Sequence, residues 1–171
     1  MKKLTFLLIA ALGFVGLSNA QFSAGLNVGT FKFTEDGAES INGFNLSANY
    51  ALDDDSRVGL NFGNYWESTD ILGVTLTSYI RPITVSYQRD IDMNGKLKPY
   101  YGAQIGLYSF GASFGDESNS ESYIGGAAVG GVRFFVNDNI GLNAGVKYHL
   151  ISLDGSTEGA FGLNLGVDYF F

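Results

Sequence analysis

The sequence contains no cysteine, one histidine and two prolines among 171 residues. Without cysteine the chain forms no disulfide, offers no thiolate nucleophile and holds no cysteine-ligated zinc. Basic residues are also scarce, since ten Lys and Arg stand against seventeen Asp and Glu and give a net charge of −7. A nucleic-acid binder needs clustered Lys and Arg against phosphate. We therefore expect no nucleic-acid partner, and the residues predict no cofactor and no metal site.

Long hydrophobic runs are missing except at the start of the chain. Lys2 and Lys3 precede an apolar stretch over 4–17, and small residues follow it at Ser18-Asn19-Ala20. This stretch is shorter than the roughly 20 residues that a transmembrane helix needs. The pattern predicts a cleavable signal peptide over 1–20, with cleavage between Ala20 and Gln21, and one mature domain over 21–171.

Glycine and aromatic residues are abundant, with 24 glycines and an aromatic content of 15%. Beyond Gln21 apolar and polar residues alternate over about ten residues at a time, the length of a tilted membrane-spanning strand. The alternation predicts eight strands, over 22–33, 42–52, 57–66, 74–89, 97–110, 122–136, 140–150 and 160–171. In the fourth segment its phase changes near Pro82, which predicts a β-bulge.

A five-residue form recurs along the chain: Gly, apolar, amide, apolar, Gly. Its copies begin at Gly25, Gly59, Gly102, Gly141 and Gly162. A period of 2 places the glycines and the amide on one face of the strand and the apolar residues on the other. Small residues and amides suit the lumen of an eight-stranded barrel, which side chains just fill. The predicted polar lumen residues are Asn27, Asn61, Gln104, Arg133, Asn143, Lys147, Asn164 and Asp168, and we expect the charged ones to neutralise one another.

Acidic and aromatic residues gather toward the ends of the predicted strands. Ten of the seventeen acids follow the first, third, fifth and seventh strands, at Glu35, Asp36, Glu39, Glu67, Asp70, Asp116, Glu117, Glu121, Asp154 and Glu158. They predict four acidic loops at one end, with weak, diffuse Mg²⁺ or Ca²⁺ association. The aromatics predict two interfacial girdles. The girdle near these loops would contain Phe31, Phe33, Phe44, Trp66, Tyr108, Phe110, Tyr123, Tyr148 and Phe161, and the other Phe22, Tyr50, Tyr87, Tyr101, Phe134, Tyr169 and Phe171.

The stretches 99–106, 130–139 and 166–171 together resemble the small eight-stranded outer-membrane β-barrel proteins of Gram-negative bacteria, grouped as outer-membrane β-barrel domain or porin-family proteins. The resemblance covers the whole mature chain. It implies an all-β fold, an eight-stranded antiparallel up-and-down transmembrane β-barrel in the outer membrane with both termini in the periplasm. It also implies outer-membrane lipid, lipopolysaccharide and the barrel-assembly machinery as partners, besides an unidentified host or surface ligand. Four terminal residues are similar to the signal that this machinery reads: Leu165, Val167, Tyr169 and Phe171.

These observations predict a structural or cell-surface interaction role with acidic loops and a filled, narrow lumen, and no enzymatic activity. The alternatives are a lipid-modifying enzyme that uses His149, a soluble periplasmic ligand-binding barrel, and a narrow pore. Lipid A deacylases of this architecture have a His-x-Ser pair, but here Ser152 follows His149 at odd spacing, which sends the two side chains to opposite faces. The stretch 90–95 matches the start of a calcium-binding loop, but Tyr101 stands where a bidentate Glu is needed, so we expect a hairpin turn there.

Overall fold

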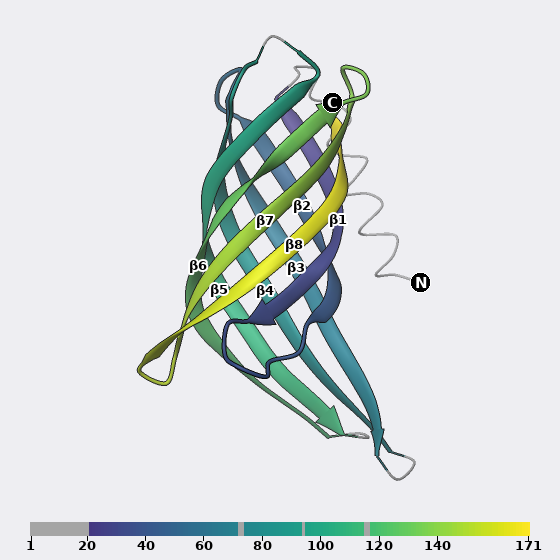
Figure 1. The fold of residues 1–171 in the computed structure, drawn as a ribbon, viewed down its shortest axis with the longest axis vertical. Helices are drawn as coiled ribbons and strands as arrows, with labels where there is room; N and C mark the ends of the chain where they lie inside the picture. The colour runs from purple at the N-terminus through teal and green to yellow at the C-terminus, as the bar shows by residue number, and fades with distance from the viewer. Residues whose placement is uncertain (1–20, 72–73, 94, 115–116) are drawn as a thin grey trace, which may run out of the picture.

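The computed structural model describes residues 21–71, 74–93, 95–114 and 117–171. The predicted signal peptide over 1–20 lies outside these ranges. Within them, eight antiparallel strands form one closed barrel in chain order (Figure 1). The strands are β1 (Phe22–Phe33), β2 (Ile41–Ala51), β3 (Ser56–Ile71), β4 (Val74–Asp90), β5 (Leu97–Phe114), β6 (Glu117–Phe135), β7 (Ile140–Leu153) and β8 (Ser156–Phe170). The described part of the chain holds no helix long and apolar enough to cross a membrane. The predicted fold class is confirmed.

Both ends of the described chain meet at one end of the barrel, which we call the terminal end. There the backbone N–H of Phe171 donates to the carbonyl of Phe22 at 3.0 Å. Short turns join β2 to β3, β4 to β5 and β6 to β7 at this end. The β1–β2 loop and the hairpins β3–β4, β5–β6 and β7–β8 lie at the opposite end, which we call the loop end (Figure 1).

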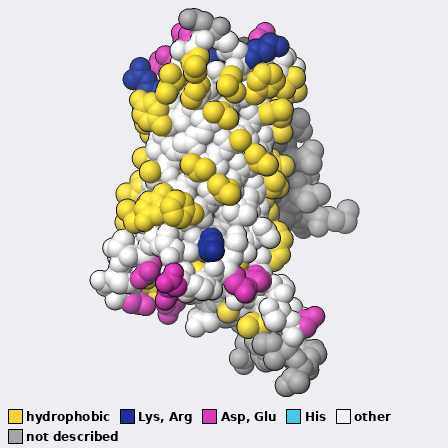
Figure 2. Space-filling model, viewed as in Figure 1, with side chains coloured by type: hydrophobic (Ala, Val, Ile, Leu, Met, Phe, Trp, Pro, Cys, Tyr) yellow, Lys and Arg dark blue, Asp and Glu magenta, His cyan; other side chains and the backbone are white. Residues whose placement is uncertain are grey.

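The barrel is apolar outside and polar inside, as the alternation predicts. Leu60 is 63% exposed on the outer face, whereas its neighbour Asn61 is 5% exposed and faces the lumen. Apolar side chains form bands around the outer surface, and most of the visible charged side chains lie toward its two ends (Figure 2). This arrangement is the reverse of a water-soluble barrel, and it matches an apolar solvent around the wall.

Several strands run farther toward the loop end than predicted. In the β3–β4 extension Ser68 Oγ lies 2.9 Å from Thr77 Oγ1, and Ser109 Oγ lies 2.8 Å from Ser122 Oγ just before the β5–β6 extension begins. The apolar alternation stops at these positions, but the backbone ladder continues because its hydrogen bonds do not depend on an apolar face. The prediction that the acids of this end lie in loops is therefore wrong for Glu67, Asp70, Glu117, Glu121 and Glu158, which lie within strands. Asp116 lies outside the described residues.

The predicted β-bulge at Pro82 is wrong. Tyr65 pairs with Ile80 and Phe62 pairs with Ile83, so the register of β3 and β4 is the same on both sides of Pro82. The phase of the sequence pattern changes for another reason. Ile80 points into the barrel and belongs to a buried apolar cluster, whereas Ile83 lies on the outer face.

The β7–β8 hairpin closes with a two-residue turn. Leu153 pairs with Ser156, and the residues between them, Asp154 and Gly155, have φ values of 46° and 90°. Two consecutive positive φ angles are the geometry of a type I′ turn, for which Asp-Gly is a preferred sequence. The predicted hairpin at Asn94-Gly95 includes a position outside the described residues.

Candidate functional site

The lumen at the terminal end contains an ion-pair cluster of Arg57, Asp90, Arg133 and Asp168. Arg133 donates from Nη1 to Asp90 at 2.6 Å and from Nε to Asp168 at 2.9 Å. The other oxygen of Asp90 accepts from Arg57. All four side chains are buried. Because each carboxylate of the cluster meets an arginine, the charges are paired within a region that water scarcely reaches.

Aromatic rings enclose the ion-pair cluster. The Arg133 guanidinium lies 4.9 Å from the ring centre of Tyr100, and the Arg57 guanidinium lies 5.4 Å from that of Phe170. Both distances are within the range of a cation–π contact, which adds to the ion pairs.

The sequence predicted only part of this cluster. Arg133 and Asp168 pair as expected, but Lys147 forms no ion pair with any described residue, so its predicted neutralisation is wrong. Arg57 and Asp90 were missed as lumen residues. Their position in the alternation could have revealed them. Residues an even number of positions apart on a strand have the same parity and share a face. Arg57 has the parity of Asn61, and Asp90 has the parity of Ser86; Asn61 and Ser86 both face the lumen.

The middle of the lumen contains a layer of amides. Asn61 donates to Ser86 Oγ at 3.0 Å, Asn164 donates to Asn143 Oδ1 at 3.3 Å, and Asn143 donates to Asp168 at 3.1 Å. A cavity of about 30 Å³ remains, lined in part by Asn27, Gln104 and Lys147. The structure thus places all eight predicted polar lumen residues inside the barrel.

A buried apolar cluster, here called the apolar plug, crosses the lumen toward the loop end. It consists of Phe31, Tyr65, Ile80, Tyr108, Ile151 and Ala160. Tyr108 and Ile151 have no exposed surface. The girdle prediction is therefore wrong for the inward-facing rings Phe31, Phe33, Tyr108, Phe110 and Tyr123, which line or pack against this cluster.

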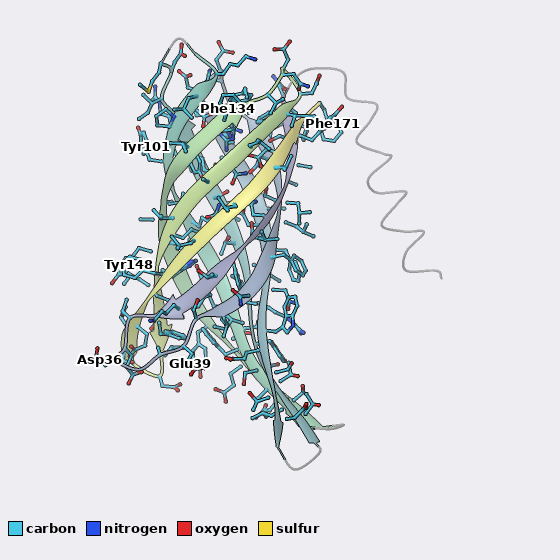
Figure 3. All side chains as sticks on the ribbon, turned by 45° about the vertical axis from the view of Figure 1, so that its right-hand side comes forward. Asp36, Glu39, Tyr101, Phe134, Tyr148 and Phe171 are labelled. Atoms are coloured by element: carbon cyan, nitrogen blue, oxygen red, sulfur yellow. The ribbon has the colours of Figure 1, made fainter. Side chains whose placement is uncertain are left out.

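The outer rings fit the two girdles better. Tyr101, Phe134 and Phe171 project outward near the terminal end, and Tyr148 projects outward nearer the loop end (Figure 3). Phe44 and Trp66 pack edge to face with ring centres 6.2 Å apart, and Trp66 is exposed. The rings that follow the parity of the lipid-facing leucines form the girdles, whereas the others fill the lumen.

His149 is buried beside the apolar plug. Its Nδ1 lies 2.9 Å from the hydroxyl of Tyr108, and its ring centre lies 4.9 Å from that of Phe31. Ser152 is exposed on the opposite face of β7, as the odd spacing predicts. The hydroxyl that pairs with His149 is therefore the buried phenol of Tyr108. In the described ranges His149 forms no hydrogen bond with a carboxylate.

A cleft of about 700 Å³ opens at the loop end, on the side of the apolar plug that faces away from the amide layer. Its aromatic lining includes Phe33, Phe110 and Tyr123, and three carboxylates also line it, those of Glu39, Glu121 and Asp154. The cleft lies between the β1–β2 loop, the loop-end parts of β4, β5 and β6, and the β7–β8 turn. We call it the loop-end cleft.

A family model described as the outer membrane protein beta-barrel domain matches residues 4–171. The chain belongs to this family. Its place is the outer membrane of a Gram-negative bacterium, so the alternative of a soluble periplasmic barrel is wrong. Short periplasmic turns and longer extracellular loops are the rule for such barrels. The terminal end is therefore periplasmic and the loop end extracellular.

Solved structures with the same fold include two bacterial surface proteins. Neisserial surface protein A is 23% identical, with a TM-score of 0.74 over 88% of this chain and 97% of that chain. Ail, the attachment invasion locus protein of Yersinia pestis, was solved with the heparin analogue sucrose octasulfate; it is 21% identical, with a TM-score of 0.65 over 88% of this chain and 98% of that chain. Among curated proteins, protein opa of Haemophilus influenzae is 29% identical over 97 residues, covering 54% of this chain and 80% of opa.

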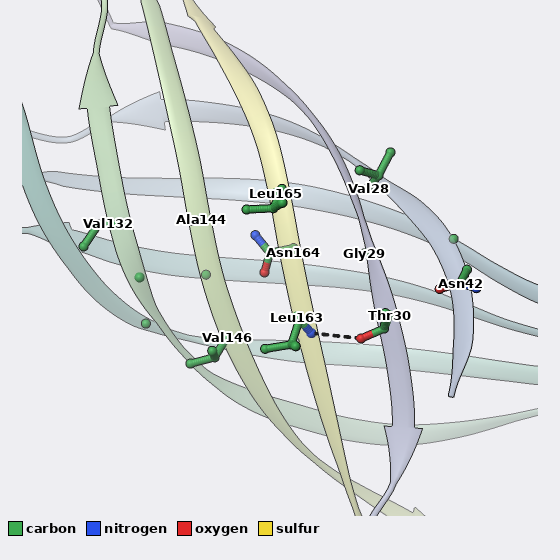
Figure 4. Close-up of a pocket in the computed structure, with 14 residues that line it drawn as sticks. Val28, Gly29, Thr30, Asn42, Val132, Ala144, Val146, Leu163, Asn164 and Leu165 are labelled. Carbon is green, nitrogen blue, oxygen red and sulfur yellow. Dashed lines mark hydrogen bonds between the residues drawn. The ribbon is translucent and has the colours of Figure 1, made fainter. Parts of the chain in front are cut away.

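The lipid-facing wall has a broad apolar depression of about 740 Å³ across β2, β1, β8, β7 and β6 (Figure 4). The side chains of Val28, Val146 and Leu165 project from the wall at this depression. Gly130 and Ala144 have no side chain or a short one, so the surface is hollow there. Because the depression faces lipid and is lined mainly by hydrocarbon, acyl chains suit it, and it belongs to the wall of the barrel.

The residues of the predicted assembly signal lie on the outer face of β8 and at its end. Leu165, Val167, Tyr169 and Phe171 are all exposed to lipid, and the rings of Tyr169 and Phe171 pack edge to face with centres 5.0 Å apart. At the predicted cleavage site, Ala20 lies outside the described residues. Gln21 is joined to the barrel, since its side-chain oxygen accepts from the Tyr50 hydroxyl at 2.7 Å.

Proposed function

We propose that this outer-membrane barrel acts at the cell surface through its extracellular end and that its lumen carries no solute. One observation supports this most directly. The ion-pair cluster and the apolar plug each cross the lumen, and only about 30 Å³ of space lies in the amide layer between them. A space of this size holds a few water molecules at most. A sugar or an amino acid is far larger, which disfavours the alternative of a narrow pore.

The extracellular end, unlike the closed lumen, offers a surface on which a partner can bind. Strands β3 to β6 extend as polar hairpins beyond the outer apolar band, and acidic side chains gather below that band (Figures 1 and 2). Ail binds a polysulfated heparin analogue in its solved complex. This chain carries Glu39, Glu121 and Asp154 around its extracellular cleft, so it would repel a polysulfate and favour basic partners.

The geometry of His149 supports a non-enzymatic protein. A hydrolase would need a nucleophile activated by the imidazole and a path for its lipid substrate. His149 instead pairs with the phenol of Tyr108, which belongs to the apolar plug and has no exposed surface.

At the lipid boundary we propose contact with lipopolysaccharide. Lys32 and Arg81 are exposed on the outer face of the extracellular half. The Arg81 guanidinium is held by Asn64 Oδ1 at 2.8 Å and by the ring of Tyr79 at 3.9 Å, which leaves further N–H groups for a phosphate. The acids nearby would add diffuse Mg²⁺ or Ca²⁺ association.

A liposome-swelling assay tests the closed lumen. Liposomes that contain the wild-type barrel should swell in isosmotic arabinose no faster than empty liposomes. A large open porin in parallel liposomes serves as the positive control. Faster swelling with the wild-type protein contradicts the closed lumen.

An adhesion assay tests the surface role. In the variant, a two-residue Asn-Gly turn replaces residues 67–78, which removes the tip of the β3–β4 hairpin and keeps the membrane part of both strands. Cells that carry this variant at wild-type outer-membrane levels should lose attachment to abiotic surfaces or host cell layers. Unchanged attachment on both contradicts a role for this hairpin.

A further inference from the structure

The loop-end cleft has the size and lining of a small-molecule site. Its volume of about 700 Å³ is comparable to that of sites that hold drug-sized ligands, and its outer side is open. The apolar plug forms its floor, so a ligand in the cleft has no path into the lumen.

One side of the cleft is a continuous aromatic surface. The ring centres of Phe33 and Phe110 lie 6.0 Å apart, and those of Phe110 and Tyr123 lie 5.9 Å apart. These three side chains are only partly buried and pack on the apolar plug. Rings at such distances present their faces and edges to a ligand without rearrangement, and aromatic faces attract organic cations.

The charge in the cleft has one sign. Tyr123 Oη donates to Glu121 at 2.5 Å and lies 3.4 Å from Asp154 Oδ2, so a single phenol brings the two carboxylates together. Glu39 lies on the β1–β2 side of the same cleft. The described residues that line the cleft include no Lys, Arg or His. A cation between the carboxylates would therefore relieve like-charge repulsion.

An organic cation fits this site better than a metal ion. In the ranges that the structure describes, no group of three or more His, Cys, Asp or Glu is arranged to hold a metal. The three carboxylates come from separate segments of the chain and stand beside aromatic rings, whereas a hard divalent cation needs six or more oxygens arranged around it. Rings and carboxylates together suit an ammonium group on an apolar body.

We infer that the loop-end cleft binds a small organic cation, with an ammonium group between Glu121 and Asp154 and an apolar body against Phe33 and Phe110. This goes beyond the surface role proposed above and does not depend on the closed lumen, since the cleft lies outside the apolar plug.

Three probes of similar size test the inference: phenethylamine as the cation, phenethyl alcohol as the neutral analogue and 3-phenylpropionate as the anion. Each is titrated by NMR against the full barrel, ¹⁵N-labelled, in phosphatidylcholine nanodiscs at neutral pH. Phenethylamine should shift the amide signals of Phe110, Glu121 and Tyr123 with a dissociation constant on the order of 1 mM, the affinity expected for so small a ligand. The alcohol should bind more weakly and the anion should not bind.

A charge-matched pair of variants separates the site from the general acidity of the surface. The double variant Glu121→Gln/Asp154→Asn should weaken phenethylamine binding about fivefold, the effect of losing two partly exposed charge contacts. The control Glu35→Gln/Asp36→Asn removes the same charge from the β1–β2 loop outside the cleft, and it should change the affinity less than twofold. The spectra of both variants also report whether the barrel is folded.

Each contrary result overturns the inference. The cleft is no cation site if the alcohol binds as tightly as the amine, or if both double variants weaken binding equally. The same holds if the shifts appear only at lipid-facing positions, or if phenethylamine causes none at ten times the expected dissociation constant. Neither the swelling nor the adhesion measurement changes with these outcomes, so the proposed surface role is tested separately.

Discussion

The two ends of the lumen are closed by opposite chemistry. At the periplasmic end, Arg57, Asp90, Arg133 and Asp168 form a buried network in which each group depends on its partners. At the extracellular end, the apolar plug consists of side chains that pack without charge. Removal of one member of an ionic network leaves a buried charge unpaired, whereas removal of one apolar side chain leaves only a void. The periplasmic end is therefore the more sensitive to single substitutions.

Asp90→Ala should have the largest effect, because Asp90 accepts from both Arg57 and Arg133. The substitution leaves Arg57 buried without its carboxylate and should lower the free energy of unfolding by about 4 kcal/mol. Urea unfolding in lipid vesicles measures the change. The control Asp138→Ala removes an exposed acid from the β6–β7 turn at the same end and should be close to neutral. Equal losses in the two variants would contradict the role of the cluster.

Ile151→Ala tests the apolar plug at a side chain with no exposed surface. The void should cost about 3 kcal/mol in the same unfolding measurement, less than the loss at Asp90. Leu150→Ala is the matched control, since Leu150 is the preceding residue and faces lipid. It loses contact with mobile acyl chains instead of a packed core, so its loss should be clearly smaller. If Leu150→Ala costs as much, the plug adds nothing beyond general apolar contact.

Tyr108→Phe sharpens the comparison, because it removes a single polar contact from the mainly apolar end. The hydroxyl lies 2.9 Å from His149 Nδ1, and its loss leaves a buried ring nitrogen unpaired. The expected cost is about 1 kcal/mol. The ¹⁵N shift of His149 Nδ1 reports the lost hydrogen bond, while Tyr87→Phe on the outer face should leave both quantities unchanged. An unchanged His149 shift in Tyr108→Phe would show that the bond is absent in the membrane.

The smallest effect is expected at Asp53 in the exposed β2–β3 turn. A hydrogen bond from the Ser56 side chain, with further bonds from the amides of Asp55 and Ser56, lowers the pKa of the Asp53 carboxyl. A lowered pKa in the folded state stabilises the barrel above the ordinary carboxyl pKa of about 3.9, and this contribution is lost as the pH falls through the folded value. The melting temperature of Asp53→Asn should therefore lie slightly below that of the wild type at neutral pH and converge with it in acid. A difference that stays constant with pH would contradict the charge effect.

Much of the fold could be predicted from the period of 2. The outward leucines and inward amides of Leu60-Asn61 and Leu163-Asn164 are local properties of a strand, because successive side chains point to opposite faces. The same rule would have placed Tyr108 inside, since it shares its parity with Gln104. The girdle prediction fails at Tyr108 because it rests on aromatic type, whereas position along the strand decides which face a side chain occupies.

The partners within the lumen could not be predicted in this way. Parity places Asp90 inside the barrel but does not say which strand lies opposite its carboxylate. Closure of the barrel and the tilt of its strands bring Asp90 on β4 next to Arg133 on β6. They place Lys147 on β7 beside the amide layer instead. The pairing of Asp90 with two arginines is therefore a property of the closed barrel.

The sequence by itself determined the faces of the strands, the approximate number of strands and the membrane as solvent, because alternation and side-chain chemistry act over neighbouring residues. The tertiary structure decided what depends on several strands meeting: the ion-pair cluster, the plug and the loop-end cleft with its rings and carboxylates. These contacts join residues far apart in the chain, and only the register and curvature of the closed sheet set the distances between them.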